Sequence, residues 1–123
     1  LFYTNWELFS LASDVDSSRP PFVFNNQRRF TLQCELDAAF FHLLQFSRAD
    51  VLQALSTFDV LERREVREHG DYRTKLQILE IYDAMQRAID TGEPYQTLLD
   101  PPPADSRCAH PESTRPHWAN ENG

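Results

Sequence analysis

The stretch from Asn26 to Leu44 constrains the fold of this chain more than any other part of the sequence. Its apolar residues recur at intervals of three and four in two adjacent rows, Phe30, Cys34, Phe40, Phe41 and Leu44, and Leu32, Leu36, Ala39 and Leu43. This spacing is typical of a helix, and two rows make a wide apolar surface rather than a narrow stripe. We therefore expect a central helix over 26–45, capped by Asn25 or Asn26 and covered on most sides by other segments.

A second periodic stretch predicts another long helix, over 72–91. Its apolar residues are Tyr72, Leu76, Leu79, Tyr82, Met85 and Ile89. Asp71 precedes this stretch and is predicted to cap the helix, and Gly92 follows it where a left-handed residue often ends a helix. The matching apolar faces predict that the two long helices pack on each other.

Shorter elements fill the rest of the chain. Residues 1–12 hold several aromatics and predict a short helix or turn that inserts them into the core, and residues 22–24 predict one short extended segment. The sequence of 47–50 is Ser-Arg-Ala-Asp, which is a capping-box pattern that begins a helix. Residues 62–69 predict a charged helical turn or two, closed by Gly70.

Length and composition favour one small, mainly α domain. A chain of 123 residues can bury one modest core, and three glycines are few for a turn-rich β fold. Pro94 and the run Pro101-Pro102-Pro103 favour extended backbone. We expect a single helical C-terminal accessory domain over 1–111, with an N-terminal aromatic segment and a proline-rich extended tail, and a flexible end over 112–123.

The net charge and the length of the apolar runs limit the cellular locations and the binding partners that we expect for this chain. A net charge of −7 argues against a chain that coats phosphates along its whole surface, although a local basic patch stays open. Apolar runs fall well short of the ~20 residues of a membrane span, so we expect no membrane partner. Two cysteines without a framework pattern favour a cytoplasmic protein. Because the chain begins at Leu1 and its only methionine is Met85, we expect a processed, truncated or excised piece.

Glu35 and Asp37 lie in the middle of the apolar central stretch. Residues two apart point about 200° away from each other on a helix, so these carboxylates cannot together chelate one metal or form an acid–base pair. An unpaired buried carboxylate is costly. We therefore expect that each is paired with a cation or with a capping hydrogen bond from a packed segment.

Basic residues gather between positions 62 and 75. They are Arg63, Arg64, Arg67, Arg73 and Lys75, interleaved with Glu62, Glu65, Glu68 and Asp71. Arg73 and Lys75 fall in the first turn of the second long helix, where cations oppose the helix dipole, so a negative group is expected opposite them. That group is either Glu35 or Asp37, which predicts ion pairs between the two long helices, or a nucleic-acid phosphate. The five cations are thus candidate DNA-binding residues, while their near balance with four anions equally fits a mixed solvated face.

Motifs for catalysis, cofactors or metals are not found. Cys108, His110 and His117 lack the paired spacing of a structural zinc site. The run Asp100-Pro101-Pro102-Pro103 has a proline where the acid-Pro-Pro-aromatic motif of amino-directed DNA methyltransferases needs an aromatic ring to stack on a flipped base. The sequence also lacks a glycine-rich cofactor loop, a phosphate loop and a nucleophile elbow. We predict no catalytic residue, no metal and no cofactor in this chain.

Three stretches carry several motifs in a fixed order. They are Arg29-Phe30 with Cys34-Glu35-Leu36-Asp37-Ala38-Ala39-Phe40-Phe41-His42-Leu43, Gly70-Asp71-Tyr72-Arg73-Thr74-Lys75 with Ile78-Leu79-Glu80-Ile81-Tyr82-Asp83, and Pro94-Tyr95-Gln96-Thr97 through Asp100-Pro101-Pro102-Pro103-Ala104-Asp105. Together they resemble the extreme C-terminal region of large bacterial adenine-specific DNA methyltransferases, found in bifunctional type II restriction–modification enzymes and related phage-defence systems. The resemblance runs from Tyr3 to Pro111.

The chain departs from that family at two positions. Gln45 stands where the family usually has a glycine, which makes the end of the central helix harder to place. Asp59 stands where the family has a proline after Phe58, which allows more helix there.

In such enzymes the S-adenosylmethionine site and the catalytic motif lie well upstream. The resemblance therefore implies a non-catalytic C-terminal module whose partners are the rest of the parent methyltransferase and DNA, in binding or target recognition. The alternative is a structural or protein-interaction domain that braces the parent without touching DNA, which the acidic charge balance favours. An independent small enzyme has no supporting group of residues.

Overall fold

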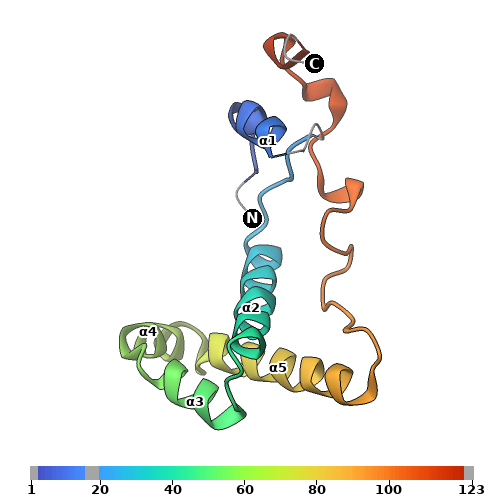
Figure 1. Cartoon of the computed structure of the whole chain (residues 1–123). Helices are drawn as coiled ribbons and strands as arrows, with labels where there is room; N and C mark the ends of the chain where they lie inside the picture. The colour runs from blue at the N-terminus through green and yellow to red at the C-terminus, as the bar shows by residue number, and fades with distance from the viewer. Residues whose placement is uncertain (1–2, 16–19, 121–123) are drawn as a thin grey trace. The chain divides into compact units, whose positions relative to one another are not determined.

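The computed structural model describes residues 3–15 and 20–120, and it is mainly helical (Figure 1). The α-helices are α1 (Phe9–Asp14), α2 (Asn26–Leu43), α3 (Arg48–Ser56), α4 (Asp59–His69) and α5 (Arg73–Thr91). The short 3-10 helices are η1 (Trp6–Leu8), η2 (Ser106–Cys108), η3 (Glu112–Thr114) and η4 (His117–Asn120). The predicted fold class, mainly α with two long helices, is confirmed.

The chain divides into two compact units. One is Phe30–Leu98, and the other combines Leu1–Arg29 with Leu99–Gly123. The division predicted from sequence, a domain over 1–111 and a flexible end over 112–123, stays a prediction.

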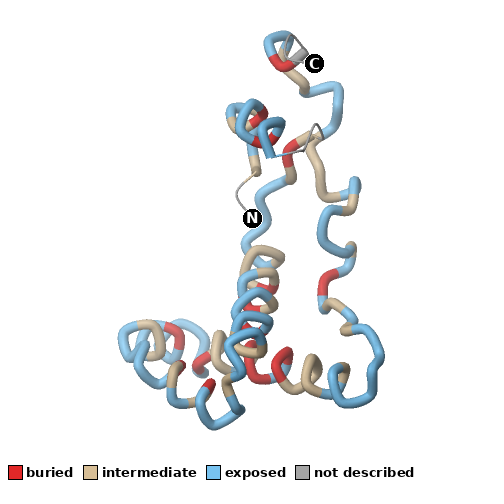
Figure 2. Tube along the Cα trace, viewed as in Figure 1, coloured by how far each residue is buried: buried red, intermediate tan, exposed pale blue. Residues whose placement is uncertain are grey.

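The core of the 30–98 unit lies where α2, α3 and α5 meet (Figure 2). Its buried residues are Cys34, Ala38, Val51, Leu55, Tyr72, Ile78, Leu79, Ile81 and Tyr82. Each large aliphatic side chain that is fully buried here contributes about 1.5–3 kcal/mol. The predicted contact between the two long helices is present, because the ring of His42 stacks on that of Tyr82 with 4.0 Å between the centroids.

Local signals set several helix ends as expected. The Asn25 Oδ1 accepts a hydrogen bond from the Arg28 backbone N–H at 2.9 Å, which caps α2. Ser47 and Asp50 form both halves of the predicted capping box at the start of α3. Gly70 and Gly92 end α4 and α5 in the left-handed conformation, with φ of 83° and 74°.

Two elements differ in length from their predictions. α4 begins at Asp59 rather than at Glu62. A proline at position 59 would also fit this first helical position, so the absence of one does not account for the earlier start. α2 ends at Leu43, two residues early, and Gln45 adopts a positive φ of 60°. Gln45 thus has the backbone conformation that a glycine takes most easily.

Only one side of α2 is covered within the described part of the chain. Thr31, Cys34 and Ala38 are buried, whereas Leu36, Phe40 and Leu43 are 46%, 58% and 74% exposed. The prediction that other segments cover this helix on most sides is therefore wrong for the described residues. The core of this unit forms on the side of α2 that holds Cys34 and Ala38.

In the other unit, the N-terminal aromatics pack around one arginine. The Arg115 guanidinium carbon lies 4.9 Å from the ring centre of Trp6 and 5.2 Å from that of Phe9. The Trp6 indole N–H donates to the Thr114 Oγ1 at 3.2 Å. Phe22, predicted to be extended, pairs with Ala109 in a single antiparallel bridge, and strands are absent from the described residues.

None of the helices within residues 3–15 and 20–120 combines the length and the apolar character needed to cross a bilayer. The predicted cytoplasmic location stays a prediction.

Candidate nucleic-acid interface

α4 presents three of the predicted DNA-binding arginines to solvent. Arg63, Arg64 and Arg67 line, with Val60, a shallow cavity of about 340 Å³. Arg63 is paired with Asp59, with 2.5 Å between its Nη2 and the Oδ2. Among the described residues, Arg64 and Arg67 have no ion-pair partner. Because they are three residues apart, these two guanidiniums lie on the same side of the helix.

A larger and more polar cavity lies between α2, α4 and α5. It has a volume of about 590 Å³, and its lining residues are Phe30, Gln33, Cys34, Asp37, Leu61, Arg64, Glu65, Glu68, His69, Arg73 and Thr74. Arg64 lines both cavities, so the two are neighbours. The structure thus brings Arg63, Arg64, Arg67 and Arg73 into one region. Lys75, half-buried in the first turn of α5, is outside both linings.

Arg73 is held in the larger cavity by an aromatic ring. Its guanidinium carbon lies 4.1 Å from the ring centre of Phe30. The Nε of Arg73 is buried and has no hydrogen-bond partner. A buried donor without an acceptor costs about 1–3 kcal/mol, which a cation–π contact of about 0.5–2 kcal/mol partly offsets. Arg73 is therefore a fixed cation whose donors are not all satisfied.

Asp37 lies in the lining of the same cavity, and it is not paired with Arg73. Asp37 is exposed as a residue, and the partial desolvation of its carboxyl raises its pKa above the ordinary range. Cys34 is buried beside it, and burial, together with the charges of Asp37 and Glu65, raises the pKa of its thiol to about 12. The thiol therefore stays neutral at physiological pH.

Glu35 has a different partner from the predicted cation. Its carboxylate accepts hydrogen bonds from the Tyr95 hydroxyl at 2.8 Å, the Thr97 hydroxyl at 2.8 Å and the Leu98 backbone N–H at 2.9 Å. The structure therefore differs from the predicted ion pairs of Glu35 or Asp37 with Arg73 or Lys75. For Glu35, the alternative expectation is confirmed, because its carboxylate accepts capping hydrogen bonds from a packed segment.

The negative group at the start of α5 is Glu65, which the sequence did not single out. Its buried carboxylate accepts hydrogen bonds from the Thr74 backbone N–H at 2.7 Å and from the Thr74 hydroxyl. The predicted cap, Asp71, is wrong, because Tyr72 occupies the N-cap position and makes no side-chain capping bond. After the left-handed Gly70, α5 contacts α4, and a carboxylate of α4 can reach its first turn.

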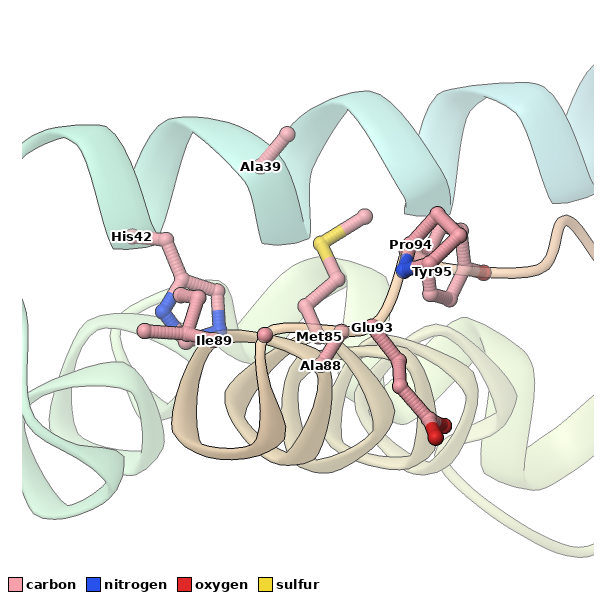
Figure 3. A pocket seen from close by; sticks show the side chains of 9 residues that line it. Ala39, His42, Met85, Ala88, Ile89, Glu93, Pro94 and Tyr95 are labelled. Atoms are coloured by element: carbon pink, nitrogen blue, oxygen red, sulfur yellow. The ribbon is translucent and has the colours of Figure 1, made fainter.

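A third cavity of about 590 Å³ lies between the C-terminal halves of α2 and α5 (Figure 3). Its lining is mostly apolar, with the Met85 side chain extending toward α2 and the Glu93 carboxylate pointing away. The polar atoms near it are already bound: the His42 Nε2 contacts the Tyr82 carbonyl at 3.0 Å, and the Tyr95 hydroxyl is held by Glu35. This cavity offers packing surface rather than reactive groups.

Groups of three or more potential metal ligands are absent from the described residues. No family model, no curated protein and no solved structure matches the chain. The resemblance to the C-terminal regions of adenine methyltransferases therefore stays a prediction.

Proposed function

We propose that this chain is a non-catalytic C-terminal module of a cytoplasmic adenine-specific DNA-modification protein, and that it assists the DNA binding of its parent. The S-adenosylmethionine cofactor would belong to the parent. The resemblance of residues 29–43, 70–83 and 94–105 supports the class of protein. The observation that carries the DNA contact is the pair Arg64 and Arg67, two exposed guanidiniums on one side of α4 without a partner among the described residues.

The charges of the chain determine how strongly this contact can bind DNA. A guanidinium binds a phosphate by two parallel hydrogen bonds, and each neutralised phosphate releases counterions. The net charge of −7 opposes DNA elsewhere on the surface. The module therefore adds a local contact to a complex held mainly by the parent, where tethering makes even a weak contact effective.

Fluorescence anisotropy with a labelled DNA duplex at low salt tests the proposal. The double variant Arg64→Ala/Arg67→Ala is expected to bind at least tenfold more weakly than the unmodified chain. Arg87→Ala is the matched control, because it removes an exposed arginine of α5 that lies outside both cavities. Equal weakening by the double variant and by Arg87→Ala would count against a site on α4.

A second candidate function is the bracing of the parent by protein contact alone. The exposed apolar residues Leu36, Phe40 and Leu43 favour it, because their spacing places them on one side of α2. Under this function, Phe40→Glu weakens association with the rest of the parent, while Arg64→Ala/Arg67→Ala leaves DNA binding unchanged. Pull-down of the parent fragment by each variant, beside the anisotropy assay, separates the two functions.

A further inference from the structure

Among the charged residues that line the cavity between α2, α4 and α5 are Arg73 and Asp37, which are not paired with each other. Arg73 comes from the first turn of α5, and Asp37 comes from the middle of α2. No ion pair joins Arg73 to Asp37, and neither side chain has another ion-pair partner among the described residues. Asp37 is exposed and Arg73 is half-buried, so both charges are open to a ligand that enters the cavity.

The two groups present complementary hydrogen-bonding forks. Arg73 offers only donors in a planar fork, and because its Nε is buried, its terminal Nη groups are the donors that a ligand can meet. Asp37, when ionised, offers only acceptors, on two oxygens. A single ligand that satisfies both must present two adjacent acceptors on one edge and two adjacent donors on the next.

Guanine is the nucleobase with this arrangement. Its N7 and O6 accept from an arginine fork, which is the commonest specific arginine contact to a base, and its N1–H and N2 amino group can donate to a carboxylate. Adenine, cytosine and thymine lack two adjacent donors beside two adjacent acceptors. A volume of about 590 Å³ lies within the range of small-molecule sites.

We infer that this cavity binds a guanine base, with Arg73 on its O6 and N7 and Asp37 on its N1–H and N2 amino group. The Phe30 ring beneath the guanidinium keeps the fork in place. The base is either part of a nucleic acid or a free guanine nucleotide. This inference goes beyond the phosphate contacts proposed above and stands without them.

Calorimetric titration of the purified chain with dGMP, dIMP and dAMP tests the inference. We expect dGMP to bind about tenfold or more tightly than dAMP, because a bidentate pair discriminates bases by about 1–3 kcal/mol. Inosine lacks the N2 amino group, so dIMP is expected to bind more weakly than dGMP. Equal affinity for the three nucleotides, or no binding of any of them, would overturn the inference.

Two aspartate variants make the test specific. Asp37→Asn keeps the shape of the side chain but replaces one acceptor by a donor, so it is expected to remove the preference for dGMP over dIMP. Asp71→Asn is the matched control, since Asp71 is exposed and lies outside the cavity lining, and it should keep that preference. An unchanged preference in Asp37→Asn would contradict the inference.

The source of the base, and the independence of this site from the arginines of α4, can each be tested. Binding of a thymidine heptamer with one central dG, compared with dGMP, tells whether the base comes from nucleic acid or from a free nucleotide. The duplex assay of Arg64→Ala/Arg67→Ala compares total DNA affinity and does not depend on which base the chain prefers. If the chain does not prefer dGMP, but Arg64→Ala/Arg67→Ala still weakens duplex binding, only this inference is refuted. If the chain prefers dGMP, but the double variant binds the duplex as tightly as the unmodified chain, only the proposed function is refuted.

Discussion

Glu65 of α4 accepts a hydrogen bond from the Thr74 backbone N–H at 2.7 Å and so caps the first turn of α5 from a neighbouring helix. The N-terminus of a helix carries unsatisfied N–H groups and a partial positive charge, which a carboxylate neutralises. Glu65 also reduces the unfavourable effect of placing Arg73 and Lys75 at that end. This one carboxylate therefore helps to fix α5 against α4 and, with it, Arg73 in its cavity.

Removal of this cap should destabilise the fold. Glu65→Ala leaves both the N–H and the hydroxyl of Thr74 without their acceptor in a buried place, and we expect a loss of about 2 kcal/mol or more in the free energy of unfolding. Glu68→Ala, one turn on and exposed, should change it by no more than about 0.5 kcal/mol. Urea unfolding of both variants is the measurement, and equal effects would contradict the capping role.

Gln45 should be replaceable by glycine with a gain in stability. Its φ of 60° lies in the left-handed region, which costs a residue with a side chain about 1–2 kcal/mol relative to the right-handed one. Gln45→Gly removes this cost and adds some unfolded-state entropy, so we expect a net gain of about 0.5–1 kcal/mol. Thermal unfolding checks it, with Gln53→Gly, inside α3, as a control that should lose stability. A lower stability of Gln45→Gly would contradict the left-handed assignment.

The carboxyl of Asp37 should make stability depend on pH. Burial raises its pKa in the folded state, so its ionisation disfavours folding at any pH above that raised value. Asp37→Asn is therefore expected to be more stable than the unmodified chain at neutral pH, by less than ~1 kcal/mol because the carboxyl keeps part of its solvent.

The difference in stability between Asp37→Asn and the unmodified chain should shrink as the pH falls through the raised pKa of Asp37. It should vanish below the pKa that Asp37 has in the unfolded chain. Denaturant midpoints of both proteins across this pH series provide the measurement. A stability gain that grows at acid pH would contradict the assignment.

The carboxylate of Glu35 should control the order of residues 95–98. Glu35→Gln loses charge-assisted hydrogen bonds to Tyr95, Thr97 and Leu98, each worth about 1.5–3 kcal/mol. We expect the Leu98 amide to exchange with solvent about tenfold faster or more, while the Ile81 amide in the core keeps its protection. Hydrogen exchange by NMR measures both, and an unchanged rate at Leu98 would show that the segment is held by other contacts.

The parts of the fold predicted correctly depend on neighbours in sequence. Asn25 reaches an N–H three residues on, and Ser47 and Asp50 complete a box within one turn. The long helices follow from apolar spacing, and Gly92 ends the second of them. In each case a side chain or a glycine acts within about one helical turn, which a sequence pattern can express.

The parts that were not predicted depend on contacts distant in sequence. Glu65 reaches Thr74 across nine positions, and Glu35 reaches Tyr95 across sixty. The choice between Asp71 and Glu65 as the cap of α5 depends on the path of the chain after α4, which the sequence does not give. The contact between the Phe30 ring and Arg73 depends on the same path. The sequence marked Arg73 as a cation in need of a negative partner, and the structure instead places it over an aromatic face.

The salt dependence of DNA binding tests the central claim most directly. Each phosphate contact adds about 0.9 to the slope of log K against log salt concentration, so Arg64→Ala/Arg67→Ala should lower the magnitude of that slope by up to about 1.8. Arg87→Ala should leave the slope as it is in the unmodified chain. If the double variant keeps both the slope and the affinity of the unmodified chain, α4 does not contact DNA and the proposed function is contradicted.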